Sequence, residues 1–183
     1  MSRSALVLLA PGFEEIEATC PIDLLHRAEV QVTVAAVGED LLVTGRSELT
    51  LHADCLFPEV LDQNFDLLVL PGGPAVFDLR EQPRVLDLIR RFQLEERIIG
   101  AICAAPLLLL DAGLLPGPRY TAHGSVADEL PDLITDSETI TEGTLITSRG
   151  AGTAVSFGLA MVCALCGPEP AEAIRQSIHA PSS

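Results

Sequence analysis

Aromatic residues are scarce in this chain, which has no tryptophan, one tyrosine and six phenylalanines among its 183 residues. Basic residues are scarce as well, with 11 Lys and Arg against 26 Asp and Glu and a net charge of -15. Proteins that bind nucleic acid or anionic membrane surfaces need clustered basic side chains to contact phosphate groups. The composition therefore predicts a protein with an aliphatic core and with neither nucleic acid nor a membrane as a partner.

Long apolar runs are also missing, because none reaches the ~20 residues that cross a bilayer. The first run, residues 5–10, is too short for a signal peptide and is followed by Pro11-Gly12 instead of a cleavage site. The five cysteines are an odd number without the spacing of a disulfide framework, which is typical of reduced thiols. These features predict a cytoplasmic protein.

Cofactor motifs are absent too. No group of His, Cys, Asp and Glu has metal-ligand spacing, and neither a GxGxxG pattern nor a phosphate-binding loop occurs. We therefore expect no metal ion and no cofactor.

Apolar runs of strand length alternate with segments of helical spacing along the chain. The predicted strands are residues 5–9, 31–36, 65–70, 98–102 and 144–148. The predicted helices are residues 14–28, 84–93, 104–112, 153–166 and 170–177, and the alternating residues 48–52 indicate an antiparallel hairpin or edge strand. Continuous apolar strands are typical of a parallel sheet covered by helices on both faces. The sequence thus predicts one α/β domain over residues 1–183.

Cys103 lies where the predicted strand 98–102 turns directly into a helix. That position is at the carboxyl edge of the sheet, where open α/β folds bind ligands. The free N–H groups and the positive dipole end of a helix favour the thiolate, which is the reactive form of cysteine. The arrangement is the cysteine counterpart of the serine nucleophile elbow. The alternative is a buried cysteine that acts only as a small apolar residue.

Two further strand ends supply polar groups at the same edge. Glu17 follows the first strand, and the Gly72-Gly73 loop follows the strand 65–70. A thiol, a carboxyl group and free backbone N–H groups are what addition to a carbonyl requires. Burial and a nearby thiolate would raise the pKa of Glu17 and leave a carboxyl that donates to sulfur. The alternative is that the acids at 14, 15 and 17 only stabilise the first turn of a helix.

The remaining candidates are weaker. His123 follows a short predicted strand and is placed to orient or protonate a group near Cys103, although most loop histidines are structural or exposed. The pair Cys163 and Cys166 has CxxC spacing but ends an apolar helix instead of opening one. Because a redox pair needs the helix N-terminus to lower its thiol pKa, we expect these two cysteines to be buried and structural.

Four segments together resemble the ThiJ/PfpI superfamily, and most closely its branch of parkinsonism-associated deglycase and YajL-like bacterial proteins. They are ALVLLAPGFEEIEA (5–18), DLLVLPGG (66–73), AICAAP (101–106) and TSRGAGTAVSFGLA (147–160). The resemblance implies a flavodoxin-like α/β sandwich that forms a homodimer. It also implies that Cys103 is the reactive cysteine and Glu17 its carboxyl partner.

The resemblance extends to the remaining candidate site residues. It implies that backbone N–H groups of the Gly72-Gly73 loop and of Ala104 form an oxyanion hole and that His123 lies nearby. Glu15, Arg27 and Arg149 complete the set, the two arginines near the site or the dimer interface. One departure is informative, because the residue after the cysteine is Ala104 where the protease-like branch has histidine. A Cys-His peptidase is therefore not expected.

Two classes of function use these same residues. In the first, the Cys103 thiolate adds to a reactive aldehyde such as methylglyoxal or glyoxal and forms a 2-hydroxy acid without glutathione or metal. Repair of glycated protein side chains is a variant of that chemistry. In the second, the protein is a non-catalytic oxidative-stress sensor or chaperone whose Cys103 is oxidised to the sulfinic acid. The sequence does not separate them, since only turnover does.

Overall fold

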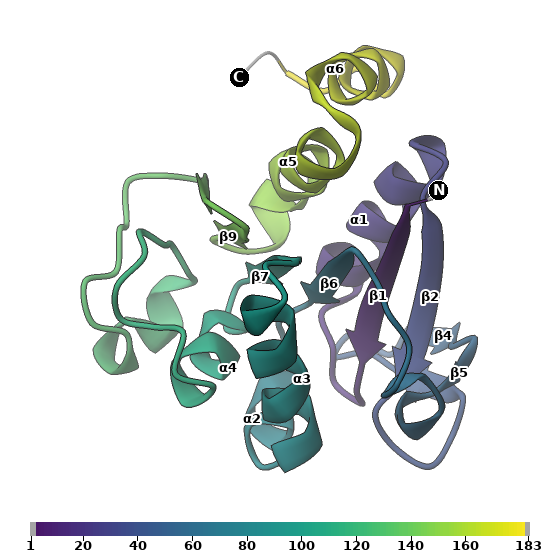
Figure 1. The fold of residues 1–183 in the computed structure, drawn as a ribbon, viewed down its shortest axis with the longest axis vertical. Helices are drawn as coiled ribbons and strands as arrows, with labels where there is room; N and C mark the ends of the chain where they lie inside the picture. The colour runs from purple at the N-terminus through teal and green to yellow at the C-terminus, as the bar shows by residue number, and fades with distance from the viewer. Residues whose placement is uncertain (1–2, 182–183) are drawn as a thin grey trace.

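The computed structural model describes residues 3–181 and contains a seven-stranded sheet in the order β5-β2-β1-β6-β7-β9-β8. All neighbouring strands are parallel except β8, which runs antiparallel to β9 at one edge. Helices cover both faces (Figure 1), so the predicted flavodoxin-like α/β fold is confirmed. Four residues of the predicted 1–183 domain, at positions 1, 2, 182 and 183, lie outside the described part.

The strands match the apolar runs closely. Their bounds are Ser4–Leu9 (β1), Gln31–Ala36 (β2), Leu42–Thr44 (β3), Thr50–His52 (β4), Cys55–Leu56 (β5), Leu67–Leu70 (β6), Ile98–Ile102 (β7), Thr139–Glu142 (β8) and Leu145–Ser148 (β9). The central strands are almost entirely buried because both faces of the sheet are covered. β3 and β4 form a separate antiparallel hairpin, as the alternating residues 48–52 predict.

The helices form two layers. Their bounds are Glu15–Arg27 (α1), Ala75–Arg80 (α2), Pro83–Leu94 (α3), Pro106–Asp111 (α4), Ala154–Cys166 (α5) and Pro168–Ser177 (α6). Helices α1, α5 and α6 pack together on one face, and α2, α3 and α4 on the other (Figure 1). Glycines allow the close contacts of α5: a Cβ at Gly100 in β7 would lie 2.5 Å from Met161 Sδ, and one at Gly158 would lie 2.5 Å from Leu24 Cδ1. Within residues 3–181, no helix is both long and apolar enough to cross a membrane.

Several elements differ from the sequence-based expectation. The helix predicted at 104–112 begins only at Pro106, and residues 103–105 form a turn. The short strand expected before His123 is irregular chain. The helix α2 and the edge strand β8 were not predicted, because each is short and depends on tertiary contacts for its stability.

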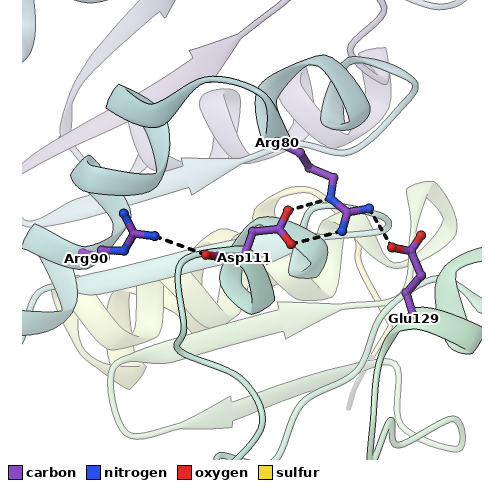
Figure 2. A network of polar contacts seen from close by, with 4 residues as sticks. All are labelled: Arg80, Arg90, Asp111 and Glu129. Atoms are coloured by element: carbon purple, nitrogen blue, oxygen red, sulfur yellow. Dashed lines mark hydrogen bonds and ion pairs between the residues drawn. The ribbon is translucent and has the colours of Figure 1, made fainter.

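A polar network holds together the helical layer that lies next to the site (Figure 2). Arg80 at the end of α2 makes a bidentate pair with Asp111 of α4 and also bonds Glu129, with N···O distances of 2.6–3.0 Å. Arg90 of α3 donates to the carbonyl oxygens of Asp111 and Ala112. Glu129 belongs to the 3₁₀ helix η2 (Gly124–Glu129), so the network anchors the loop that begins at His123.

Candidate functional site

Cys103 occupies a strained turn at the carboxyl end of β7. Its φ angle is +65°, a left-handed conformation that is rare for a residue with a side chain. Two hydrogen bonds of 2.9 Å hold it there, from its N–H to the Ser148 carbonyl and from the His123 N–H to its own carbonyl. This is the elbow geometry expected from the sequence, and it presents a half-buried thiol at the sheet edge.

Glu17 lies in the first turn of α1 and is only 1% exposed. The Gly72 N–H donates to its Oε2 at 2.9 Å, and Glu14 caps the helix by accepting from the Glu17 N–H at 2.8 Å. Gly72 therefore positions the carboxyl group, which differs from its expected place among the oxyanion donors. The prediction that Glu17 is buried beside the thiol agrees with this geometry.

The carboxyl group of Glu17 and the thiol of Cys103 are electrostatically coupled. Burial raises the pKa of Glu17 to about 7, although hydrogen bonding with Cys103 opposes the increase. Burial also raises the pKa of the Cys103 thiol to about 12, and the negative charge of Glu17 adds to that increase. Burial and the charge of an ionised Glu17 thus act against the thiolate that the sequence predicts, which was expected beside a protonated Glu17. A neutral Glu17 removes this repulsion and can donate to the thiolate, so the pair shares one proton near neutral pH.

Two backbone N–H groups act on the sulfur. Burial raises the pKa of the Cys103 thiol, and the N–H groups of Gly73 and Ala104 oppose that increase by favouring the ionised form. Gly73 has φ +92°, and a Cβ there would lie 2.5 Å from the Gly12 carbonyl oxygen. A Cβ at Gly72 would lie 2.6 Å from both Cys103 Cβ and Glu17 Oε2. The two glycines therefore have no room for side chains, and they bring backbone donors against the reactive group.

His123 is exposed and caps η2. Its Nδ1 accepts from the Ser125 N–H at 3.1 Å and contacts the Ser125 hydroxyl at 2.8 Å. An Nδ1 that accepts a hydrogen bond assigns the proton of the neutral ring to Nε2. The ring is thereby oriented by η2, and it is available as a donor instead of being paired with Cys103.

Three candidates from the sequence lie apart from the thiol. The Glu15 carboxylate holds the β3–β4 hairpin by accepting from the Ser47 N–H at 2.6 Å. Although burial raises the pKa of Glu15, backbone hydrogen bonds from Ser47 and Leu49 outweigh it and lower the pKa. Arg27 pairs with Asp23 in the last turn of α1, the end opposite Glu17, and Arg149 is exposed after β9. The structure does not bring these residues into contact with Cys103 in one chain.

The CxxC cysteines do not have the environment expected for them. Cys163 is exposed and Cys166 is half-buried, so the expectation that both are buried is wrong for Cys163. They end α5, where the negative end of the helix dipole disfavours a thiolate. Among residues 3–181, no three His, Cys, Asp or Glu side chains lie together in a way that could hold a metal ion.

Sequence reasoning missed two residues that bear on Glu17. Burial raises the pKa of the Glu17 carboxyl, and the charge of Arg46, in the turn between β3 and β4, partly opposes that increase. Gly150, just after β9, faces both His123 and Glu17. The TSRG segment pointed to the second residue, but only as part of a resemblance. Together the site offers a thiol, a carboxyl with a pKa near neutrality and two backbone donors, which suits addition of sulfur to an electrophilic carbon.

Comparison with known proteins agrees with this arrangement. Residues 3–164 match the model of the DJ-1/PfpI family. The Drosophila melanogaster protein dj-1beta is 36% identical over 182 residues, which cover 97% of each chain. A crystal structure of Drosophila melanogaster DJ-1beta superposes with a TM-score of 0.96 and covers 100% of both chains.

Two further matches carry functional names. The Caenorhabditis elegans glutathione-independent glyoxalase DJR-1.2 is 34% identical over 171 residues, which cover 91% of each chain. A structure of oxidized Toxoplasma gondii DJ-1 has a TM-score of 0.94 at 29% identity and covers 99% of this chain and 100% of that one.

Proposed function

The chain belongs to the DJ-1/PfpI family, and on that premise we propose that it converts reactive 2-oxoaldehydes to 2-hydroxy acids without glutathione. The observation that carries the proposal is the pairing of Cys103 with Glu17, whose pKa of about 7 suits proton transfer at neutral pH. The named glyoxalase of Caenorhabditis elegans supports the substrate class.

The reaction begins with addition of the Cys103 sulfur to the aldehyde carbon. The new S–C bond forms as the carbonyl electron pair moves to oxygen, where the N–H groups of Gly73 and Ala104, which favour the ionised thiol, can stabilise the negative charge. The oxyanion takes a proton from the shared Glu17–Cys103 pair and becomes a hemithioacetal.

Proton transfer then oxidises the former aldehyde carbon and reduces the neighbouring carbon. The Glu17 carboxylate removes the hydrogen of the former aldehyde carbon, and a proton returns to the neighbouring carbon through an enediol. The aldehyde carbon is thereby oxidised to a thioester while the ketone is reduced to an alcohol. Water cleaves the thioester, which releases the 2-hydroxy acid and restores the thiol. In this proposal His123, whose Nδ1 accepts from the Ser125 N–H, donates from Nε2 to a substrate oxygen.

The same addition applies to aldehyde-derived adducts on protein side chains. Early glycation adducts regenerate a carbonyl or present a hemiacetal-type carbon that a thiolate attacks in the same way. Repair of glycated protein is therefore a variant of the proposed activity. The small aldehyde is the first substrate to test, since it needs no peptide groove.

A homodimer and a cytoplasmic location complete the proposal. Ile16 on α1 is 53% exposed, and Leu49 on the hairpin is 60% exposed. The two elements adjoin, because Glu15, the residue before Ile16, hydrogen-bonds to the backbone of Leu49. We take these two exposed apolar side chains as the candidate centre of the dimer interface. We expect sedimentation to give twice the chain mass and Ile16→Arg to give a monomer.

The proposed cytoplasmic location follows from the cysteines. Five free cysteines suit a reducing compartment.

The decisive experiment measures lactate from methylglyoxal under reducing conditions without glutathione. Loss of methylglyoxal alone is misleading, because any exposed thiol scavenges it. Wild type and Cys163→Ala, which removes an exposed thiol far from the elbow in sequence, should each make many lactates per site. Cys103→Ala should make none. At most one product per site in wild type, or equal turnover in Cys103→Ala, would reject the enzyme.

A redox sensor is the second candidate. The half-buried Cys103 faces backbone donors that also suit a sulfinate, and the oxidized Toxoplasma gondii structure supports chemistry of this kind in the family. Mass spectrometry after mild peroxide treatment tests it. Selective gain of two oxygen atoms at Cys103, without aldehyde turnover, would favour the sensor.

A further inference from the structure

Gly150 is a glycine that its backbone conformation does not require. It lies buried just after β9 with φ 161°, an extended conformation open to any residue. Its N–H and carbonyl both bond Thr153, which fixes the start of the next helical turn. The reason for a small residue must therefore lie in the space beside it.

That space is bounded by two groups of the site. A Cβ at Gly150 would lie 3.3 Å from His123 Cδ2 and 3.8 Å from Glu17 Oε1. These are tight to ordinary contacts, whereas a Cβ at Gly72 or Gly73 would come within 2.5–2.6 Å of its neighbours. A Cβ at Gly72 or Gly73 would therefore meet tightly packed neighbours, but one at Gly150 would press only on the exposed His123 ring, which can move by a few tenths of an ångström.

The oxygen that faces this space is the functional one. Glu17 Oε2 accepts from the Gly72 N–H, so Oε1 is the oxygen that remains for proton transfer. A substrate group placed above Gly150 therefore lies between the free carboxyl oxygen and the imidazole edge. The proposed reaction moves a proton from the former aldehyde carbon to the neighbouring carbon. That neighbouring carbon must therefore lie close to the Glu17 oxygen that carries the proton.

We propose that the substituent of the aldehyde carbon lies against Gly150, beside His123 and Glu17 Oε1, and that Gly150 sets the size limit of the substrate. This inference rests on the proposed function for its substrate class. The substituent is a formyl group in glyoxal, an acetyl group in methylglyoxal and a benzoyl group in phenylglyoxal. An added methyl group at position 150 would narrow the approach between His123 and Glu17 Oε1 and exclude the larger substituents first.

The first test compares substrates in Gly150→Ala. We expect kcat/KM to fall about twofold for glyoxal, about tenfold for methylglyoxal and about a hundredfold for phenylglyoxal, the range that one methyl group controls in an apolar site. Gly152→Ala is the matched control, because Gly152 is exposed and a Cβ there meets nothing within 4 Å. It should match wild type with all three substrates. Equal losses for all three substrates in Gly150→Ala would overturn the size limit.

The second test does not need turnover. Alkylation of Cys103 is followed by mass spectrometry with iodoacetamide, a small reagent, and N-phenylmaleimide, a bulky one. Gly150→Ala should slow the bulky reagent about tenfold more than the small one, and Gly152→Ala should slow neither. If wild type makes no lactate but this difference appears, the proposed function fails and the size limit stands. If both reagents slow equally, the size limit fails whatever the turnover.

Discussion

The two sides of the site are built in different ways. The core side consists of Glu17, Gly72, Gly73 and Cys103, which lie where β1, β6 and β7 end. It is fixed by packing so close that Gly72 and Gly73 have no room for a Cβ. The loop side consists of His123 and η2, which are mostly exposed apart from Val126 and are held by hydrogen bonds and ion pairs.

This contrast predicts how each side responds to change. The tightly packed core side tolerates no added atom, because relieving the steric clash would require movement of the backbone of the sheet. A side held by polar contacts loses stability in smaller steps, since water replaces part of each lost contact. Substitutions on the core side should therefore have large effects on both stability and chemistry, and those on the loop side small ones.

The largest effect should come from Gly72→Ala. Its Cβ would lie 2.6 Å from Cys103 Cβ and Glu17 Oε2 and 3.0 Å from the Ile102 carbonyl oxygen. We expect a loss of about 2–4 kcal/mol in the free energy of unfolding. Urea titration measures the loss, and Cys103 alkylation reports the displaced thiol. The control Gly152→Ala should change neither the stability nor the alkylation rate. A Gly72→Ala protein as stable as wild type would show that the core side can accommodate an added methyl group.

The next effect should come from Glu17→Gln, which keeps the acceptor for the Gly72 N–H but cannot ionise. Because Glu17 is buried and its pKa rises from 4.5 to about 7, the folded state retains a proton that the unfolded state releases. Wild-type stability should therefore fall by up to ~3 kcal/mol as pH increases from about 4.5 to 7. Glu17→Gln should lack this slope and be more stable than wild type at pH 8. Parallel pH profiles for the two proteins would contradict the raised pKa.

The same Glu17→Gln variant, although more stable than wild type at pH 8, should be a poorer catalyst. In wild type, the pair loses its first proton near pH 7, so kcat/KM should rise up to that pH and then level off. Glu17→Gln should lower kcat/KM about 10²–10⁴-fold and move the rise toward the pKa of the thiol itself. Initial rates of lactate formation between pH 5 and 9 measure both features, and an unshifted profile would exclude Glu17 as the proton carrier.

The core side was also the part that the sequence predicted. The apolar runs at β1, β6 and β7 are continuous because those strands are buried on both faces, and so their ends could be located. Since parallel strands end at one edge, Cys103, Glu17 and the Gly72-Gly73 loop were expected to meet there. This expectation needs only local patterns and one topological rule.

The loop side depends on contacts between residues far apart in sequence. The tether from Arg80 to Glu129 spans 49 positions, and no periodic pattern marks it. The thiol pKa could not be predicted for a related reason. The expected helix was to begin beside Cys103, but α4 begins only at Pro106, so burial and the charge of Glu17 outweigh the backbone donors.

A smaller effect is expected at Thr147 on β9, which joins the loop side to the sheet. Its buried hydroxyl accepts from the Thr121 N–H at 3.0 Å. Thr147→Val keeps the shape but leaves that N–H without a partner, which should cost about 1–3 kcal/mol. Urea unfolding measures the cost, and hydrogen exchange at Thr121 should accelerate. Thr147→Ser, which retains the acceptor, is the matched control. Loss of stability in Thr147→Ser equal to that in Thr147→Val would assign the effect to packing.

The smallest effect should follow removal of the tether on η2. Glu129 accepts from Arg80 at 2.7 Å, but its side chain is 48% exposed, so Glu129→Gln should cost less than ~1 kcal/mol. Asp111→Asn disrupts the better-buried, bidentate pair with the same arginine and should cost more. Added salt should reduce the difference between wild type and Glu129→Gln because exposed pairs are screened. A loss in Glu129→Gln as large as that in Gly72→Ala would remove the distinction between the two sides, because η2 would then be as tightly built as the elbow.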